Sequence, residues 1–288
     1  MDDSVLTAGY QDWRFAIFAS VFAVFALLET LFPKKERVQP RGQRTLTNIG
    51  MAAIDTVVVR VLFPAAAVGA AIWAEANGWG ILNILPLPGA IAGVLAFFAL
   101  DLAIYAQHVA SHHIPVLWRV HRVHHADRDL DATSGIRFHP IEITLSMVFK
   151  IAVVIALGAP ALAVFIFEVV LNAAALATHA NLKIPGKVDR ILRYLVVTPD
   201  MHRIHHSVHR DETDANYGFN LAIWDRIFGT YIENPRDGHA TMALGLPDQQ
   251  TDAPSKLTWS LIFPFKPNVD EAASVDADRK VPKVDLAE

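Results

Sequence analysis

The sequence predicts an all-α integral membrane protein with about four to five membrane-embedded helices and a histidine-rich helical cap on the cytoplasmic side. Long apolar runs are the first reason: hydrophobic residues form 53% of the 288-residue chain and charged residues only 19%, and about 20 consecutive apolar residues span a bilayer. The second reason is a set of histidine clusters in the polar segments between these runs. The third is a basic segment after the first run, since Lys and Arg accumulate on the cytoplasmic side.

The first apolar run covers residues 13–32 and is long enough to cross a bilayer. Five basic residues follow it within a short stretch: Lys34, Lys35, Arg37, Arg41 and Arg44. The positive-inside rule then places this stretch in the cytoplasm and the N-terminus outside. For a bacterial protein, the corresponding location is the inner membrane.

The remaining runs complete the expected topology. Residues 51–74 lead outward, a turn region rich in Gly and Pro covers 75–88, and residues 89–107 return inward. A later stretch, 143–178, is interrupted at 158–160 into halves that are marginal for a crossing, so it forms either two crossings or a shallow hairpin. Both alternatives return the chain to the same side, so the two histidine-rich segments face one compartment.

This pattern predicts five segments. We expect membrane helices in 1–107, a first histidine-rich cytoplasmic segment in 108–142, a helix pair or hairpin in 143–180, a second histidine-rich cap in 181–267 and a disordered tail in 268–288. The chain has no cysteine, which excludes disulfides, thiolate zinc sites and cysteine-ligated iron–sulfur clusters. A net charge of −4 gives no basic field for nucleic acid.

The histidines are concentrated in clusters with helical spacing. One pair is four residues apart, the sequences HRVHH (121–125) and HRIHH (202–206) each carry three, and two histidines stand alone between them. Spacings of three and four place side chains on one helical face, and imidazole is the commonest protein ligand for iron, zinc and copper. Ten histidines are candidate ligands, which is more than one ion binds, so we expect two metal ions. The candidates are His108, His112, His121, His124, His125, His139, His179, His202, His205 and His206.

Polar residues share a helical stripe with two of these histidines. Asp101 and Tyr105 precede His108 by seven and three residues, and Glu168 and Asn172 precede His179 by eleven and seven. Polar groups in membrane helices usually face a functional interior. We therefore expect these four residues to support the metal ligands, with the two carboxylates accepting hydrogen bonds from histidine N–H groups. By contrast, His113, His209 and His239 are expected outside the metal site.

Other metalloprotein classes fit less well. The HExxH motif of zinc proteases and the Glu-x-x-His motifs of ferritin-like di-iron proteins are absent. Transport ligands belong near the bilayer midplane, whereas these histidines cluster beyond helix ends. A membrane metal-binding or metal-transport protein without oxygenase activity remains the alternative.

Four blocks in order resemble the fatty acid hydroxylase superfamily, in particular its sterol desaturase branch. They are DLAIYAQHVASHH, WRVHRVHHADRDLDATSGIRFHPIE, THANLKIP and TPDMHRIHHSVHRDETDANYGFNLAIWDRIFGTY, which together span residues 101–231. The arrangement of the second block looks closest to bacterial sterol-desaturase-like proteins and alkylglycerol monooxygenase.

The resemblance implies a membrane-bound, non-haem di-iron oxidoreductase. Such an enzyme hydroxylates or desaturates an unactivated C–H bond of a lipid, using dioxygen and two electrons from a separate reductase, ferredoxin or cytochrome. It also implies nine of the histidines above as ligands of two iron ions, with His139 as a candidate tenth. A sterol, a fatty acyl chain and an ether lipid remain open as substrates, as do hydroxylation, desaturation and ether cleavage as outcomes.

Overall fold

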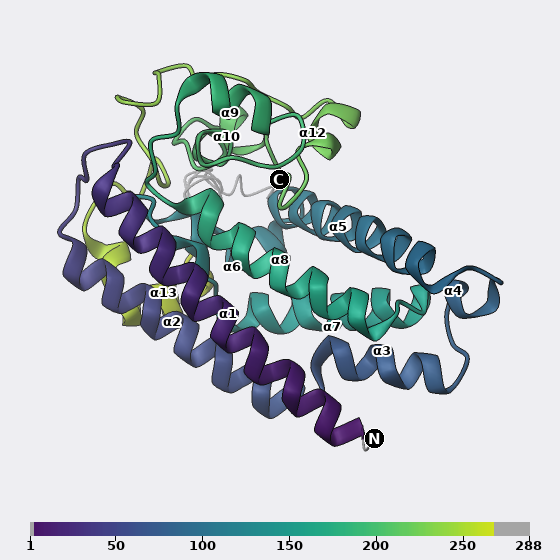
Figure 1. Cartoon of the computed structure of the whole chain (residues 1–288). Coiled ribbons are helices and arrows are strands. Elements are labelled where there is room, and N and C mark those ends of the chain that lie inside the picture. The colour runs from purple at the N-terminus through teal and green to yellow at the C-terminus, as the bar shows by residue number, and fades with distance from the viewer. Residues whose placement is uncertain (1–2, 268–288) are drawn as a thin grey trace, which may run out of the picture.

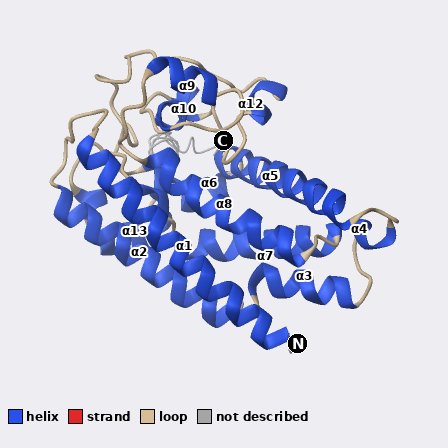
Figure 2. Ribbon diagram, in the orientation of Figure 1, coloured by secondary structure: helices blue, strands red, loops and turns tan. Residues whose placement is uncertain are grey.

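The computed structural model describes residues 3–267, so the predicted tail at 268–288 lies outside the described residues. Within that range the chain is helical and contains no strand (Figure 2). The longer helices are α1 (Asp3–Leu31), α2 (Arg41–Leu62), α3 (Ala66–Ala76), α5 (Gly89–His113), α6 (Pro115–His125), α7 (Pro140–Leu157) and α8 (Ala161–His179). The shorter ones are α4 (Ile81–Ile84), η1 (Ser134–Ile136), α9 (Gly186–Leu192), α10 (Pro199–His205), α11 (Arg210–Thr213), α12 (Ile223–Ile227), η2 (Ala253–Ser255), α13 (Leu257–Ile262) and η3 (Phe263–Phe265).

Prolines mark where many of these helices begin. Proline has no N–H and a fixed φ, so it suits the first turn of a helix, where N–H groups have no intrahelical acceptor. It occupies the N-cap of α2, α5, α8 and α9 and the first turn of α6, α7 and α10. The prolines therefore set the starting points of both membrane helices and cap helices.

Five segments are long and apolar enough to cross a membrane, which confirms the predicted number. They are Trp13–Leu31, Arg41–Ile84, Gly89–His113, Pro140–Leu157 and Ala161–His179. The expected second crossing at 51–74 is wrong in detail. Helix α2 begins ten residues earlier, at Arg41, and ends at Leu62, and a new helix starts at Ala66. Pro64 lies in this break, where its ring and missing N–H prevent a continuous helix.

Small side chains form much of the core between the membrane helices. Helices α3, α5, α7 and α8 share one buried cluster that includes Ala71, Ala96, Ala163 and Phe167. Alanines let helix backbones approach closely, which favours packing in membranes. The interruption predicted at 158–160 is the turn between α7 and α8, where Gly158 has a φ of +65°. Two separate helices of 18 and 19 residues follow from that turn.

Two segments, residues 114–139 and 180–267, form a cap over one end of the helix bundle. Figure 1 shows α9, α10 and α12 gathered at the end where α1, α5 and α8 finish. Helix α10 packs against α8, α6 packs against α5, and α13 packs against α2. The histidine-bearing ends of α5 and α8 are therefore enclosed between the bundle and the cap.

Candidate metal centre

Both HxxHH sequences fold as helices that begin with proline. Pro115 opens α6, and Pro199 opens α10 after Thr198, whose side chain accepts a hydrogen bond from the Met201 N–H. Residues three and four apart then share a face. His206 follows α10 directly as its C-cap residue. The six histidines of these two helices are all buried.

The structure brings nine of the ten predicted ligands together in two buried groups. The ends of α5 and α8 contribute the histidines that do not belong to the HxxHH helices. Within each group, the candidate ligand atoms lie within 4.8 Å of one another. The first group contains His108, His112, His121, His125 and His205, and the second contains His124, His179, His202 and His206.

The second group shows why these rings suit a cation. His124 donates from Nδ1 to the Arg137 carbonyl, and His179 donates from Nδ1 to the Ala175 carbonyl. Because a carbonyl only accepts, each Nδ1 carries the proton and each neutral ring keeps a lone pair on Nε2. Yet these Nε2 atoms lie 3.0 Å apart, and His202 Nε2 lies 3.0 Å from that of His179. Lone pairs that face one another at this distance call for a shared positive ion.

The first group has the same arrangement. His108 and His205 donate from Nδ1 to the carbonyls of Tyr217 and Ala215, at 2.8 Å each. The buried Nε2 atoms of His112 and His205 have no hydrogen-bond partner among the described residues. A buried nitrogen without a hydrogen-bond partner is costly, so these two atoms favour a site that binds a cation. Both groups therefore fit metal ions bound through Nε2.

Burial favours the neutral form of five of the cap histidines, the form that metal ligation requires. Removal from water, reinforced by neighbouring histidines, holds the pKa of four cap histidines well below the usual value: His124, His125, His202 and His206. Burial lowers the pKa of His205 to about 3. These five rings are therefore neutral at neutral pH, the form in which an imidazole nitrogen can bind a metal.

Two carboxylates orient histidines of the first group. Glu142 Oε1 lies 2.5 Å from His121 Nδ1, and Asp214 Oδ1 lies 3.2 Å from His112 Nδ1. Such contacts fix the ring orientation of metal ligands and raise their basicity. The sequence reasoning missed both residues. Glu142 could have been identified from its position in RFHPIE, three residues after His139 and in the first turn of a membrane helix.

Three of the four residues predicted to support the ligands bind other groups, so the structure does not show that role for them. Asp101 accepts hydrogen bonds from Asn220, Leu221 and Trp224. Glu168 pairs with Lys150 at 2.9 Å and with Arg14 at 2.8 Å. Asp101 lies seven residues before His108, a rise of about 10 Å. The shared stripe is therefore real, but its carboxylates lie too far along their helices to reach the rings.

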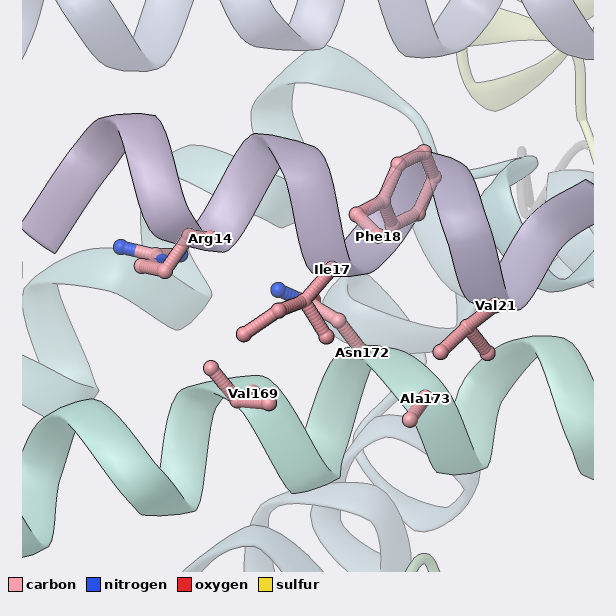
Figure 3. A pocket seen from close by; sticks show the side chains of 7 residues that line it. All are labelled: Arg14, Ile17, Phe18, Val21, Val169, Asn172 and Ala173. Carbon is pink, nitrogen blue, oxygen red and sulfur yellow. The ribbon is translucent and has the colours of Figure 1, made fainter.

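The other two members of that prediction also lie next to groups other than the histidines. The Tyr105 hydroxyl lies 2.9 Å from the Thr230 hydroxyl in the cap. Asn172 faces α1 across a shallow hollow between α1 and α8 (Figure 3). This hollow is lined by Arg14, Ile17, Phe18, Val21, Val169, Asn172 and Ala173.

Four histidines lie outside both metal groups. His139 is the N-cap of α7, where Nδ1 accepts from the Ile141 N–H and Nε2 lies 3.2 Å from the Leu261 carbonyl. Its predicted place as a tenth ligand is therefore not what the structure shows. His113 contacts the Tyr217 hydroxyl and His209 contacts Asp237. His239, like these two, is absent from the two groups, as expected.

The sequence around the histidines builds a rigid support for them. Arg137 is fully buried and donates to the carbonyls of Val123 and Pro254, while its own carbonyl accepts from His124. Arg44 pairs with Asp127 and Asp131 in the loop after α6. Burial alone would raise the pKa of Asp127, but Arg44 and Arg137 hold it below its usual value.

The NYG sequence has a comparable role on the other side of the first group. Tyr217 packs edge-on against His108, His112 and His205, with ring centroids 5.1–5.7 Å apart. The Asp225 carboxylate accepts hydrogen bonds from the Tyr217 and Gly218 N–H groups. These bonds fix the Tyr217 backbone, whose carbonyl binds His108.

Comparison with known proteins identifies relatives that modify lipids. A fatty acid hydroxylase family model matches residues 93–230. An ornithine lipid hydroxylase of Rhizobium tropici is 32% identical over 78% of this chain and 68% of its own length. An alkylglycerol monooxygenase of Xenopus tropicalis is 27% identical over 67% of this chain and 42% of its own. A lathosterol oxidase of Mus musculus is 28% identical over 54% of this chain and 47% of its own length.

The chain thus spans about two thirds of the ornithine lipid hydroxylase and less than half of the other two relatives. No solved structure matches it. The resemblance read from the histidine blocks is confirmed by the family model and by these relatives. The chain belongs to the fatty acid hydroxylase family, within its sterol desaturase-like branch of oxygen-dependent, lipid-modifying enzymes.

Proposed function

We propose that this protein is a di-iron lipid hydroxylase of a cell membrane. Its nine clustered histidines hold two iron ions, and it inserts one oxygen atom of dioxygen into an unactivated C–H bond of a lipid. The observation that carries this proposal is the convergence of imidazole Nε2 lone pairs in two adjoining buried groups. Ligands of this kind suit iron.

The residues have separable tasks in this reaction. The five-histidine and four-histidine groups would each hold one ion, which supplies the activation of dioxygen when bound. Glu142 and Asp214 hold the rings of His121 and His112 in the orientation that directs Nε2 inward. The buried setting excludes water from the reacting carbon. The second oxygen atom leaves as water after two electrons and two protons are supplied.

The electrons come from a separate donor in this proposal. The chain has no cysteine, so it cannot carry a cysteine-ligated cluster of its own. A reductase, a ferredoxin or a cytochrome that docks on the cap would meet the need. The ornithine lipid hydroxylase matches most of this chain, so an ornithine lipid is the first substrate to test, ahead of ether lipids and sterols.

The cap faces the cytoplasm in this proposal. Lys34 and Lys35 follow α1 at the cap end of the bundle, where Lys34 pairs with Asp200 and the Lys35 backbone binds Asn181. The positive-inside rule places this end in the cytoplasm and the N-terminus on the other side. A bacterial inner membrane satisfies this orientation and gives access to cytoplasmic electron donors.

The test is to purify the protein, measure its iron and assay lipid oxidation under ¹⁸O₂ with a chemical reductant. We expect about two irons per chain and one labelled oxygen in the lipid product. His124→Ala and His125→Ala each remove one member of a different group and should abolish product. His209→Ala is the matched control, because this histidine lies on the same cap outside both groups.

Two results would contradict the proposal. Wild-type product formation by His124→Ala and His125→Ala would show that the groups do not carry the chemistry. Stoichiometric metal without oxidation of any lipid class tested would favour the metal-binding alternative.

A further inference from the structure

The cap exposes a continuous set of apolar side chains in residues 191–196 and 223–228. The two segments lie side by side, joined by a bridge between Val196 and Leu221 and by a hydrogen bond from the Ala222 N–H to the Leu195 carbonyl. Leu195 is 70% exposed and Ile227 59% exposed. The set, called here the apolar patch, consists of Ile191, Leu192, Tyr194, Leu195, Val196, Ile223, Ile227 and Phe228.

Of the three charged residues within these segments, two are buried and Arg226 is partly buried. Arg193 is buried, where it pairs with Asp189 and donates to the Glu233 carbonyl. Asp225 is fully buried. Arg226 lies over the ring of Tyr231 and donates to the Arg193 carbonyl. A water-facing surface normally shows the reverse pattern, with charges outside and apolar groups inside. This polarity is typical of a surface that contacts a membrane or another protein.

Asp101 fixes the depth of this patch relative to the membrane helices. It lies at the middle of α5, twelve residues from either end of a 25-residue candidate span. Its carboxylate accepts from Asn220 Nδ2 at 2.7 Å, from Trp224 Nε1 at 2.8 Å and from the Leu221 N–H at 3.3 Å. The backbone beside the patch is therefore tied to a point about 18 Å from each end of α5, which lies inside the hydrocarbon layer if α5 spans it.

The backbone of these segments also meets the requirement of a lipid environment. Non-helical backbone at membrane depth must have its polar groups satisfied within the protein. The Val196 N–H donates to the Leu192 carbonyl, and the Val197 N–H donates to that of Asn220. The Leu221 N–H is taken by Asp101. The hydrogen bonds that water would otherwise supply are thus made internally.

We propose that the apolar patch is embedded in the hydrocarbon of the bilayer, so that the cap enters the membrane beside α5 instead of resting on its surface. The occupant of the patch is lipid acyl chain. This inference depends on the position of Asp101 and on the inverted polarity, and it does not depend on metal binding or catalysis.

The absence of cysteine allows a direct measurement of depth. Single cysteines at Leu195 and Ile227, carrying a nitroxide, are examined in proteoliposomes of phosphatidylcholine and phosphatidylglycerol. Collision rates with dissolved oxygen and with a water-soluble nickel chelate are compared by electron paramagnetic resonance. Phe98→Cys, one turn before Asp101 on the exposed face of α5, is the reference for depth. Asp211→Cys, on an exposed part of the cap, is the reference for water.

We expect Leu195→Cys and Ile227→Cys to favour oxygen over nickel, as Phe98→Cys does, at a depth within about one helical turn, ~5 Å, of that reference. Nickel accessibility equal to that of Asp211→Cys would overturn the proposal. Protection from both reagents, with an immobile label, would also overturn it, because another protein or a second copy would then cover the patch. Substituting exposed side chains leaves the packed core intact, so each variant should fold.

Discussion

Glu142 offers the sharpest test of how the structure prepares its histidines for metal. Its Oε1 lies 2.5 Å from His121 Nδ1, and its side chain is nearly buried at the first turn of α7. Glu142→Ala removes the acceptor that fixes the tautomer and rotation of His121. The ring then gains freedom, and Nε2 no longer points constantly at the five-histidine group.

Loss of such a partner typically lowers metal affinity about 10- to 100-fold, which corresponds to about 1.4–2.7 kcal/mol. Asp214 provides an internal comparison. Its contact with His112 is longer, at 3.2 Å, and its side chain is 21% exposed against 11% for Glu142. Water can replace part of that contact, so Asp214→Ala should cost about tenfold or less. Glu142→Gln keeps an acceptor oxygen without the charge and should fall between wild type and Glu142→Ala.

The assay is competition for iron(II) or cobalt(II) between purified protein and a chelator of known affinity. The expected order of weakening is Glu142→Ala, then Glu142→Gln or Asp214→Ala, then wild type. His139→Ala is the control, since this neighbouring histidine caps α7 outside both groups. Affinity of Glu142→Ala within twofold of wild type, or a larger loss for Asp214→Ala, would refute the reasoning.

Three further predictions concern the support and the protonation of the site. Gly135→Ala would place a Cβ 2.3 Å from the Ala175 carbonyl oxygen that His179 binds. The clash should lower the free energy of unfolding by about 1–3 kcal/mol and release metal from the four-histidine group. Gly186→Ala, with open space around it, should match wild type in metal content. Arg44→Ala removes the nearest cation from the buried carboxylates of Asp127 and Asp131 and should cost about 3–5 kcal/mol in the free energy of unfolding. Arg128→Ala, whose partner is exposed, should cost under about 1 kcal/mol, and equal losses would contradict this. Because burial lowers the pKa of His205 to about 3, its neutral form stabilises the folded state above pH 6.5, and this contribution is lost as pH falls towards 3. At pH 5 the free energy of unfolding is reduced by about 2 kcal/mol, so a thermal unfolding temperature that is unchanged between pH 7.5 and 5 would count against it.

The membrane helices were predictable because hydrophobic length is a local property of the sequence. The break at Pro64 was not placed correctly, because residues 51–74 are apolar on both sides of it and hydropathy alone does not indicate a turn there. The start of α2 at Arg41 was missed for a different reason. Arg44 is basic and reads as a loop residue, but its charge is neutralised by Asp127 and Asp131, 83 and 87 residues later. Partners at such separation cannot be read from local composition.

The candidate ligands were predictable for a similar reason: their spacing is local and their chemistry is specific. The orienting partners were not predictable from the helical stripes. Asp101 shares a face with His108, but helical rise separates them, and the nearer acceptors are the carbonyls of Tyr217 and Ala215 and the carboxylate of Glu142. These groups reach the rings through tertiary folding of the cap. A stripe on one helix shows which face the residues share, whereas a hydrogen bond also requires the two groups to lie at the same position along the helix axis.

The distribution of the histidines between the two groups adds a constraint on how the centre forms. Pairs four residues apart stay together, as His121 and His125 do in the five-histidine group. Adjacent histidines separate, because one residue turns a helix by about 100°: His124 joins the four-histidine group although His125 does not. The second HxxHH sequence divides in the same way at its last two residues. Each of these helices therefore contributes to both groups, so displacement of α6 or α10 changes both metal sites, and occupation of one group stabilises the helix orientation that the other requires.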